Sequence, residues 1–182
     1  GTQRTVTANG SGDWSYTAQV VPVVRYVMVR RDLDGSVTTN GSTDTGVFSI
    51  ADIAVKEGNT NLAFEKDVTS GVGTVTREVI LGNAIKSLTD GSQSTQFEIT
   101  TPNSEAWVQV DLGGYFRVDQ VLITARTSWA SRLDSSKVYM SSTNLSGKTT
   151  AELDADAVSG LISKTTIANS SSGTPFTVTA AN

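Results

Sequence analysis

Two arginines and a tryptophan lie within seven residues of one another in an otherwise small-residue stretch. They are Arg126, Trp129 and Arg132. An indole can stack on the apolar face of a sugar ring, while guanidinium groups donate hydrogen bonds to hydroxyl groups. Alternatively, Trp129 packs over the end of the fold and Arg132 pairs with a carboxylate such as Asp134 or Asp111. The residue types leave both interpretations open.

Two runs of alternating residues predict the strands that position this loop. Apolar residues at 108, 110 and 112 alternate with polar ones, and the same period of two returns at 121, 123 and 125. This period is typical of half-buried strands. We expect the glycines at 113 and 114 to form the turn between the two strands.

The composition favours strands and turns, and it excludes several classes of site. The chain has 182 residues, enough for one domain with a hydrophobic core, and a net charge of −4. An acidic chain lacks the basic stripe that binds phosphates, so nucleic acid is not an expected partner. The absence of histidine and cysteine removes disulfides, histidine-based catalysis and the usual zinc sites. No apolar run approaches about 20 residues, so no transmembrane segment is expected.

Further strands and one helix are predicted along the chain. The helix covers residues 149–157, where acidic residues come early and Gly160 follows. The predicted strands are residues 23–30, 48–55, 96–100, 136–141 and 176–180. Strict alternation places Asp52 on the same face as Phe48 and Ile50. A carboxylate there must be paired, bound to a cation or relieved by a β-bulge, because burying it alone is costly.

The two ends of the chain resemble each other. A shift of 160 positions without gaps aligns Thr5, Ala8, Asn9, Ser11 and Thr17 with Thr165, Ala168, Asn169, Ser171 and Thr177, and Tyr16 with Phe176. The β run that begins at residue 25 follows the first copy, and the second copy ends before such a run. We interpret the chain as about one period of a tandem array, plus roughly one strand.

From Asn61 onward the chain resembles the discoidin domain, also called the coagulation factor type C domain. Its bacterial carbohydrate-binding and galactose-binding-like relatives are the most similar. The resemblance rests on residues 61–63, the Asp-Gly turn at 89–91, the Ala-Trp-Val-Gln-Val-Asp-Leu-Gly run at 106–113, the loop 126–133 and residues 138–143. The family's closing strands resemble residues 25–29 and 48–55, which here precede the opening strands. The resemblance therefore covers nearly the whole chain in permuted order.

This resemblance implies an all-β fold, an antiparallel jelly-roll β-sandwich. Residues 1–57 correspond to the closing strands of a discoidin-like repeat, 58–60 to a linker, and 61–182 to the opening and middle strands. The termini of this fold lie close together, so a single permuted sandwich formed by about residues 23–182 is our first interpretation. In the alternative, residues 1–57 complete a neighbouring repeat, and strands are exchanged between chains.

The resemblance also implies a structural calcium ion at the Asp-Gly turn. Its ligands would be the carboxylates of Asp90 and Asp52, the hydroxyl group of Thr95, and the carbonyl oxygens of Leu88 and Ser92. Hard oxygen ligands of this kind suit Ca²⁺, and an ion would account for the inward phase of Asp52. The alternative is an Asx-turn without a metal.

We expect a non-catalytic, lectin-like carbohydrate-binding module of a large extracellular protein, most simply a bacterial surface or secreted one. An enzyme is not expected, because the chain lacks histidine, cysteine and a G-x-S-x-G elbow, and the carboxylates at 152, 154 and 156 fit a solvated helix face. The expected partners are cell-surface or polysaccharide glycans and neighbouring copies of the chain. Relatives that bind fucose use a histidine and a different arginine spacing, so fucose is not the expected sugar. The alternative function is a structural repeat or polymerising subunit of an adhesin, viral fibre or surface filament.

Overall fold

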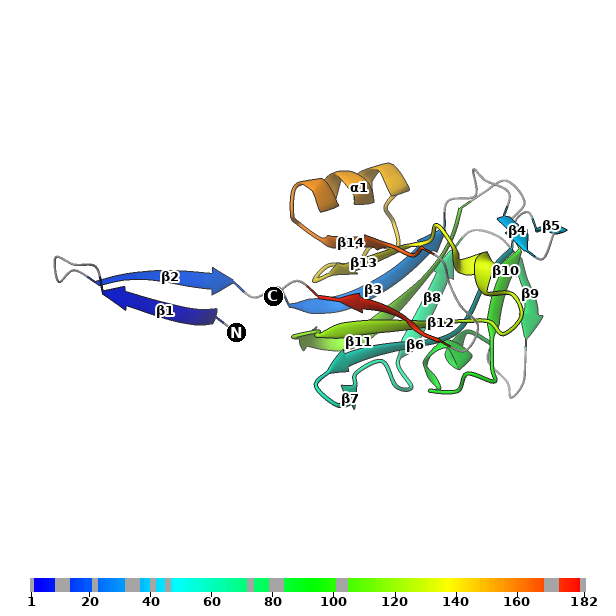
Figure 1. The fold of residues 1–182 in the computed structure, drawn as a ribbon, viewed down its shortest axis with the longest axis horizontal. Helices are drawn as coiled ribbons and strands as arrows, with labels where there is room; N and C mark the ends of the chain where they lie inside the picture. Colours follow the sequence, from blue (N-terminus) through cyan, green and yellow to red (C-terminus); the bar gives the residue numbers. More distant parts are fainter. Residues whose placement is uncertain are drawn as a thin grey trace.

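Two antiparallel β-sheets pack face to face in the computed structural model, which describes residues 2–8, 14–20, 23–31, 37–39, 42–44, 47–71, 74–78, 84–100, 105–168 and 174–180 (Figure 1). One sheet has the order β14 (Ser163–Thr166), β13 (Lys137–Ser141), β3 (Val24–Arg31), β11 (Ala106–Phe116) and β8 (Asp67–Gly71). The other has the order β15 (Phe176–Thr179), β12 (Gln120–Ala125), β6 (Val47–Glu57), β10 (Phe97–Thr100) and β9 (Thr74–Glu78), with β7 (Thr60–Asn61) beside β6. The predicted antiparallel β-sandwich is confirmed.

The remaining elements lie outside these two sheets. Two strand pairs form small sheets of their own, β1 (Thr2–Ala8) with β2 (Trp14–Val20), and β4 (Val37–Thr39) with β5 (Ser42–Asp44). The helical segments are the 3-10 turns η1 (Ala84–Thr89) and η2 (Ala130–Leu133) and the helix α1 (Thr150–Val158).

The strands β3 and β6 occupy the centres of the two sheets. β3 pairs with β11 on one side and β13 on the other, and β6 pairs with β12 and β10. Val27 and Val29 of β3 face the space between the sheets, while Met28 joins a second cluster on the outer face. A strand that is covered on both faces needs apolar residues on both, and the Val-Met-Val run supplies them.

The main core fills the space between the sheets, because each inner strand points alternate apolar side chains inward. Every strand of both sheets whose side chains are described, except β14 and the short β7, contributes to it. Its fully buried members include Phe48, Ile50, Ile53, Val108, Val110, Leu112, Val121 and Ile123. Deleting one large side chain here is expected to cost about 2–5 kcal/mol, because a cavity remains where the side chain was.

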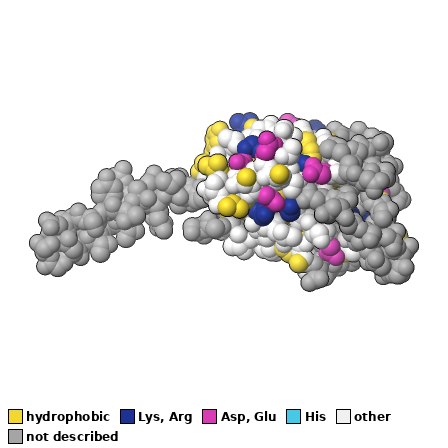
Figure 2. Space-filling view, turned by 90° about the horizontal axis from the view of Figure 1, so that it is seen from above, with side chains coloured by type: hydrophobic (Ala, Val, Ile, Leu, Met, Phe, Trp, Pro, Cys, Tyr) yellow, Lys and Arg dark blue, Asp and Glu magenta, His cyan; other side chains and the backbone are white. Residues whose placement is uncertain are grey.

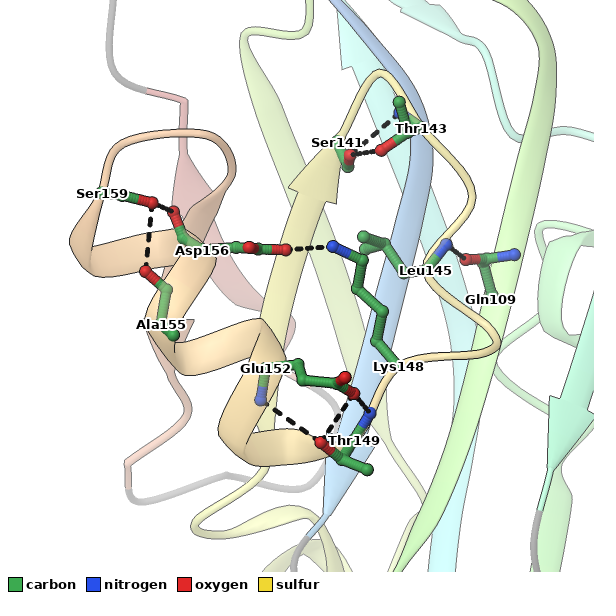
Figure 3. Close-up of polar contacts among 10 residues, drawn as sticks. All are labelled: Gln109, Ser141, Thr143, Leu145, Lys148, Thr149, Glu152, Ala155, Asp156 and Ser159. Atoms are coloured by element: carbon green, nitrogen blue, oxygen red, sulfur yellow. Dashed lines mark hydrogen bonds and ion pairs between the residues drawn. The ribbon is translucent and has the colours of Figure 1, made fainter.

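Helix α1 covers the outer face of the β13–β3–β11 region (Figure 1). Its Leu153 is fully buried in the second cluster, with Met28, Trp107 and Tyr139. The helix begins with a capping box, in which Thr149 Oγ1 accepts from Glu152 N at 3.3 Å and Glu152 Oε2 accepts from Thr149 N at 2.8 Å (Figure 3). The predicted helix is therefore confirmed, and its physical cause is local.

Charged side chains of both signs lie on α1 and beside it. Asp154 accepts a hydrogen bond from Tyr139 Oη at 2.7 Å and pairs with Lys137 and Lys164 at 3.1 and 3.2 Å. Figure 2 shows this face, where acidic and basic side chains lie next to one another among a few apolar ones. The Asp154 carboxylate therefore helps to hold α1 against the sheet.

The predicted turn at residues 113 and 114 is wrong. β11 continues through both glycines to Phe116, and its register against β3 shifts between Asp111 and Phe116. Gly113 has φ of 76°, so the extra residues are accommodated by a conformation that glycine adopts without strain. The connection to β12 instead uses residues 117–119.

Candidate functional site

The loop after β12 brings Arg126, Trp129 and Arg132 together. Trp129 N donates to Arg126 O at 3.2 Å, and Arg132 N donates to Trp129 O at 3.1 Å, so two consecutive turns wind the chain around the indole. Ser128 has φ of 68°, a conformation that is uncommon for a non-glycine residue. Such residues persist where the surrounding structure holds them, and they cluster at binding loops.

Both guanidinium groups lie against the indole. The Cζ atom of Arg132 is 4.1 Å from the centre of the Trp129 ring, and that of Arg126 is 5.9 Å away. A cation over an aromatic face is attracted by the ring's negative π-surface. The two arginines therefore hold the indole in place.

A buried carboxylate completes the cluster. Glu98 of β10 is 6% exposed, pairs with Arg126, and accepts from Arg132 Nη1 at 3.1 Å. Two cations and one anion leave the cluster with a net positive charge. Glu98 lies on β10, which β6 separates from β12, and it anchors both arginines. The expected partners of Arg132 were Asp134 or Asp111, and Glu98 was not one of them.

A second residue missed by sequence reasoning is Arg31, at the end of β3. It is 1% exposed, and its Nη1 donates to the carbonyl oxygen of Arg132 at 2.8 Å and to that of Val47. Arg31 thereby ties η2 to the beginning of β6. The buried Arg31 side chain thus fixes the loop to the sandwich, which is how a rigid scaffold positions a binding loop.

The arrangement differs from the expected one in the role of Arg132. Its side chain is only 11% exposed and covers one side of the half-buried indole, so it supports Trp129 and does not extend into solvent. Thr127 and Ser128, next to the indole, are exposed. The Arg126 side chain is similarly enclosed, at 13% exposure, so a ligand would meet the rest of the indole and these two residues.

Trp107 lies in the second hydrophobic cluster and is 8% exposed. Its ring passes over Gly71, where an added Cβ would lie 2.2 Å from the ring, so only glycine fits. Trp107 is therefore a core residue, as its place in a strand indicates.

The Asp-Gly turn forms a compact polar loop after η1. Asp90 Oδ1 accepts from Ser92 N at 2.7 Å, and the Thr95 hydroxyl donates to both Asp90 oxygens at 3.1 and 3.0 Å. The same hydroxyl group reaches Ser92 O at 3.0 Å. Three of the five expected calcium ligands, Asp90, Ser92 and Thr95, therefore lie in this turn and contact one another, while Leu88 lies in η1 just before it.

Asp52 reaches the turn from β6, and a β-bulge sets its orientation. The register against β12 moves from Ala125 opposite Ile50 to Thr124 opposite Asp52, so Ala51 is the extra residue of a bulge. After the bulge, the Ile53 side chain points into the core and the Asp52 side chain points toward Gly91. The bulge, one of the three expected solutions, accounts for the position of Asp52 without an ion.

The environment of Asp52 disfavours its charge. Burial raises its pKa to about 6, the nearby Asp90 carboxylate adds to the rise, and the hydrogen bond from Gly91 N at 3.2 Å opposes it. The carboxylates of Asp52 and Asp90, which affect each other electrostatically, and the Thr95 hydroxyl group are oxygen ligands of the kind that a hard divalent cation prefers. Within the described residues, no group of three or more His, Cys, Asp or Glu side chains could hold a metal.

Comparison with known proteins agrees with this architecture. The profile of the NedA-like galactose-binding domain family matches residues 87–178, about half of the chain. This stretch contains Glu98, the Trp129 loop and the Asp90 turn, and the match confirms the discoidin-like resemblance. Neither the curated proteins nor the solved structures gave a significant match. Of the helices in the described part of the chain, none is long and apolar enough to cross a membrane. The chain belongs to the NedA-like galactose-binding domain family, whose fold indicates carbohydrate binding.

Proposed function

We propose that this domain is a non-catalytic carbohydrate-binding module and that the Trp129 loop is its sugar site. The observation that carries the proposal is the fixed position of the Trp129 indole. The Cζ atom of Arg132 lies 4.1 Å from its ring centre, and the buried Glu98 pairs with that arginine. A rigid aromatic surface beside exposed hydroxyl groups suits the apolar face and the hydroxyl edge of a pyranose. The family's name makes galactose-terminated glycans the first to test.

A binding role without catalysis is supported by the state of the carboxylates near α1. Glu152 caps the helix, Asp154 accepts from Tyr139 and two lysines, and Asp156 pairs with Lys148. Each is engaged in holding α1 in place, and the chain has no histidine or cysteine. This is the basis for proposing that the domain is not an enzyme.

A structural calcium ion between Asp52 and Asp90 is a second part of the proposal. An ion there would neutralise two carboxylates that repel each other across Gly91, and it would fasten β6 to the Asp90 turn. An extracellular location, on a secreted or cell-surface protein that is most simply bacterial, fits both an ion of this kind and a glycan partner.

A structural role in a repeat or filament is the other candidate. It is supported by the separate sheet of β1 and β2 and by the resemblance between the two ends of the chain. In this role the partners would be neighbouring copies of the chain, as in an adhesin, viral fibre or surface filament, and the Trp129 loop would bind nothing.

A glycan array with the full chain and two variants separates the candidates. Trp129→Ala removes the proposed platform. Tyr115→Ala removes an aromatic residue of β11 that is 61% exposed and lies near the start of β12, whereas the Trp129 loop follows the end of β12. A lectin gives signals that Trp129→Ala abolishes and Tyr115→Ala retains. A silent array for the folded full chain favours the structural role.

A further inference from the structure

The hairpin β1–β2 coincides with the edge strands β14 and β15 when the chain is shifted by 160 positions. Residues 163–166 of β14 correspond to residues 3–6 within β1, and residues 176–179 of β15 correspond to 16–19 within β2. The resemblance between the two ends therefore relates two strands at the same spacing in sequence, although β1 and β2 pair with each other and β14 and β15 lie at the edges of different sheets, so the hairpin would have to open to replace them.

The side-chain pattern of β15 is repeated in β2. In β15, Val178 is 2% exposed and faces the core, and Thr177 and Thr179 are exposed. The corresponding residues are Ala18, Thr17 and Gln19, so the small apolar residue again lies between polar ones. A strand with this period places the same kind of face on the core.

The charge on β14 is also repeated in β1. Lys164 of β14 pairs with Asp154 of α1 at 3.2 Å, and its counterpart is Arg4. An arginine at this position can make the same ion pair. The first strand pair thus matches the requirements of both edges.

The chain connection allows β1 and β2 to reach these edges. β15 ends at the link between β11 and β12, where Ala180 N donates to Asp119 O at 2.9 Å, and β3 begins beside the same link, with Val24 opposite Phe116 (Figure 1). Val20 is the counterpart of Ala180, and four residue steps join it to Val24. Four extended residues span up to about 14 Å, enough to cross the short link.

We propose that residues 2–20 are a second set of edge strands, able to pair with β12 and β13 in place of β15 and β14 of the same chain. Only one set can occupy the edges of a given sandwich. Val178 and Ile167, both buried, are larger than their counterparts Ala18 and Thr7. They bury more apolar surface, so β14 and β15 are the more stable occupants of these edges.

The first test uses substitutions in the full chain. Val178→Asp places a charge in the core and weakens β15, whereas Ala18→Asp affects only the second set. Val178→Asp should keep a cooperative thermal transition at a lower melting temperature, and Ala18→Asp alone should shift it by less than about 2 °C. The double variant should lose the transition, because neither set then fits. Additive shifts in the double variant would overturn the proposal.

The second test traps the exchanged pairing. Thr177 pairs with Leu122 across β15 and β12, so Thr17→Cys combined with Leu122→Cys should form a disulfide only when β2 occupies that edge. The chain has no other cysteine. On a non-reducing gel, the Val178→Asp background should raise the fraction of monomer with an internal crosslink at least five-fold, and a crosslink found only between two chains would contradict the proposal. A folded Val178→Asp variant without any crosslink would refute the exchange.

Discussion

Arg132 Nη1 lies 3.1 Å from Oε1 of Glu98, and this ion pair is almost completely removed from water. Arg126 contacts the same carboxylate, so one anion neutralises part of the charge of two guanidinium groups. The pair connects β10 to the loop after β12. The position of Trp129 therefore depends on a residue from a different strand.

Replacing Glu98 by Gln should destabilise the domain strongly. Breaking a buried ion pair leaves uncompensated charge and costs about 3–5 kcal/mol. Urea unfolding followed by circular dichroism measures the loss. Lys148→Gln is the matched control, because its pair with Asp156 is more exposed and should cost under about 1 kcal/mol. Equal losses in the two variants would contradict the anchoring role of Glu98.

Trp129→Ala should weaken sugar binding about ten-fold or more without unfolding the sandwich. The indole is half-buried in a loop outside the main core, so its loss removes a ligand surface and leaves the core intact. Isothermal titration with the best array hit gives the affinity, and the melting curve reports on the fold. Unchanged affinity in a folded variant would exclude this loop as the site.

Calcium should raise the melting temperature, and a chelator should lower it. A ligand that binds only the folded state stabilises it by about 2.7 kcal/mol at one hundred times its dissociation constant. The difference in melting temperature between EDTA and about 5 mM Ca²⁺ should disappear in Asp90→Asn. Identical melting curves for the unaltered chain in EDTA and in calcium would count against the ion.

Asp52 should make stability depend on pH between about 4 and 6. Its pKa is about 6 in the folded state and near 3.8 when unfolded, so the folded state binds the proton more tightly. The free energy of unfolding therefore falls as pH rises through this window, by up to about 3 kcal/mol for a shift of two units. Asp52→Asn should flatten the curve and be the more stable protein at pH 7.5 in EDTA. A parallel pH profile in the variant would place the dependence elsewhere.

The full chain should be a monomer by light scattering across a concentration series. β3 and β6 pair with β11, β13, β12 and β10 of their own chain in the structure, which satisfies the centres of both sheets. Open-ended assemblies that grow with concentration would instead mean that the closing strands pass between chains. The structural role would then be favoured over the lectin.

Local patterns were enough to predict much of the fold. The helix α1 was predicted from the early acidic residues and from Gly160 after the last turn, where it adopts φ of 74°, and the structure adds the capping box of Thr149 and Glu152. The central strand β3 was visible because its apolar run is long enough to be covered on both faces.

Features that depend on two distant segments were not predictable. Glu98 lies between Phe97 and Ile99, so alternation assigns it to the outer face, and nothing nearby in sequence shows that two arginines cover it. The bulge at Ala51 is a matter of register against β12, which a single strand's sequence does not record. Local sequence indicated where the sugar site should lie, but not the side chains that hold it.

The central position of β3 has a consequence for how the chain acquires its structure. Val29 pairs with Val108, which lies 79 positions later, and with Val138, which lies later still. During synthesis this apolar strand emerges long before either neighbour, so it must remain unpaired while most of the chain is made. Such long-range pairing makes folding slow, and it leaves an apolar strand exposed to aggregation until its partners are made.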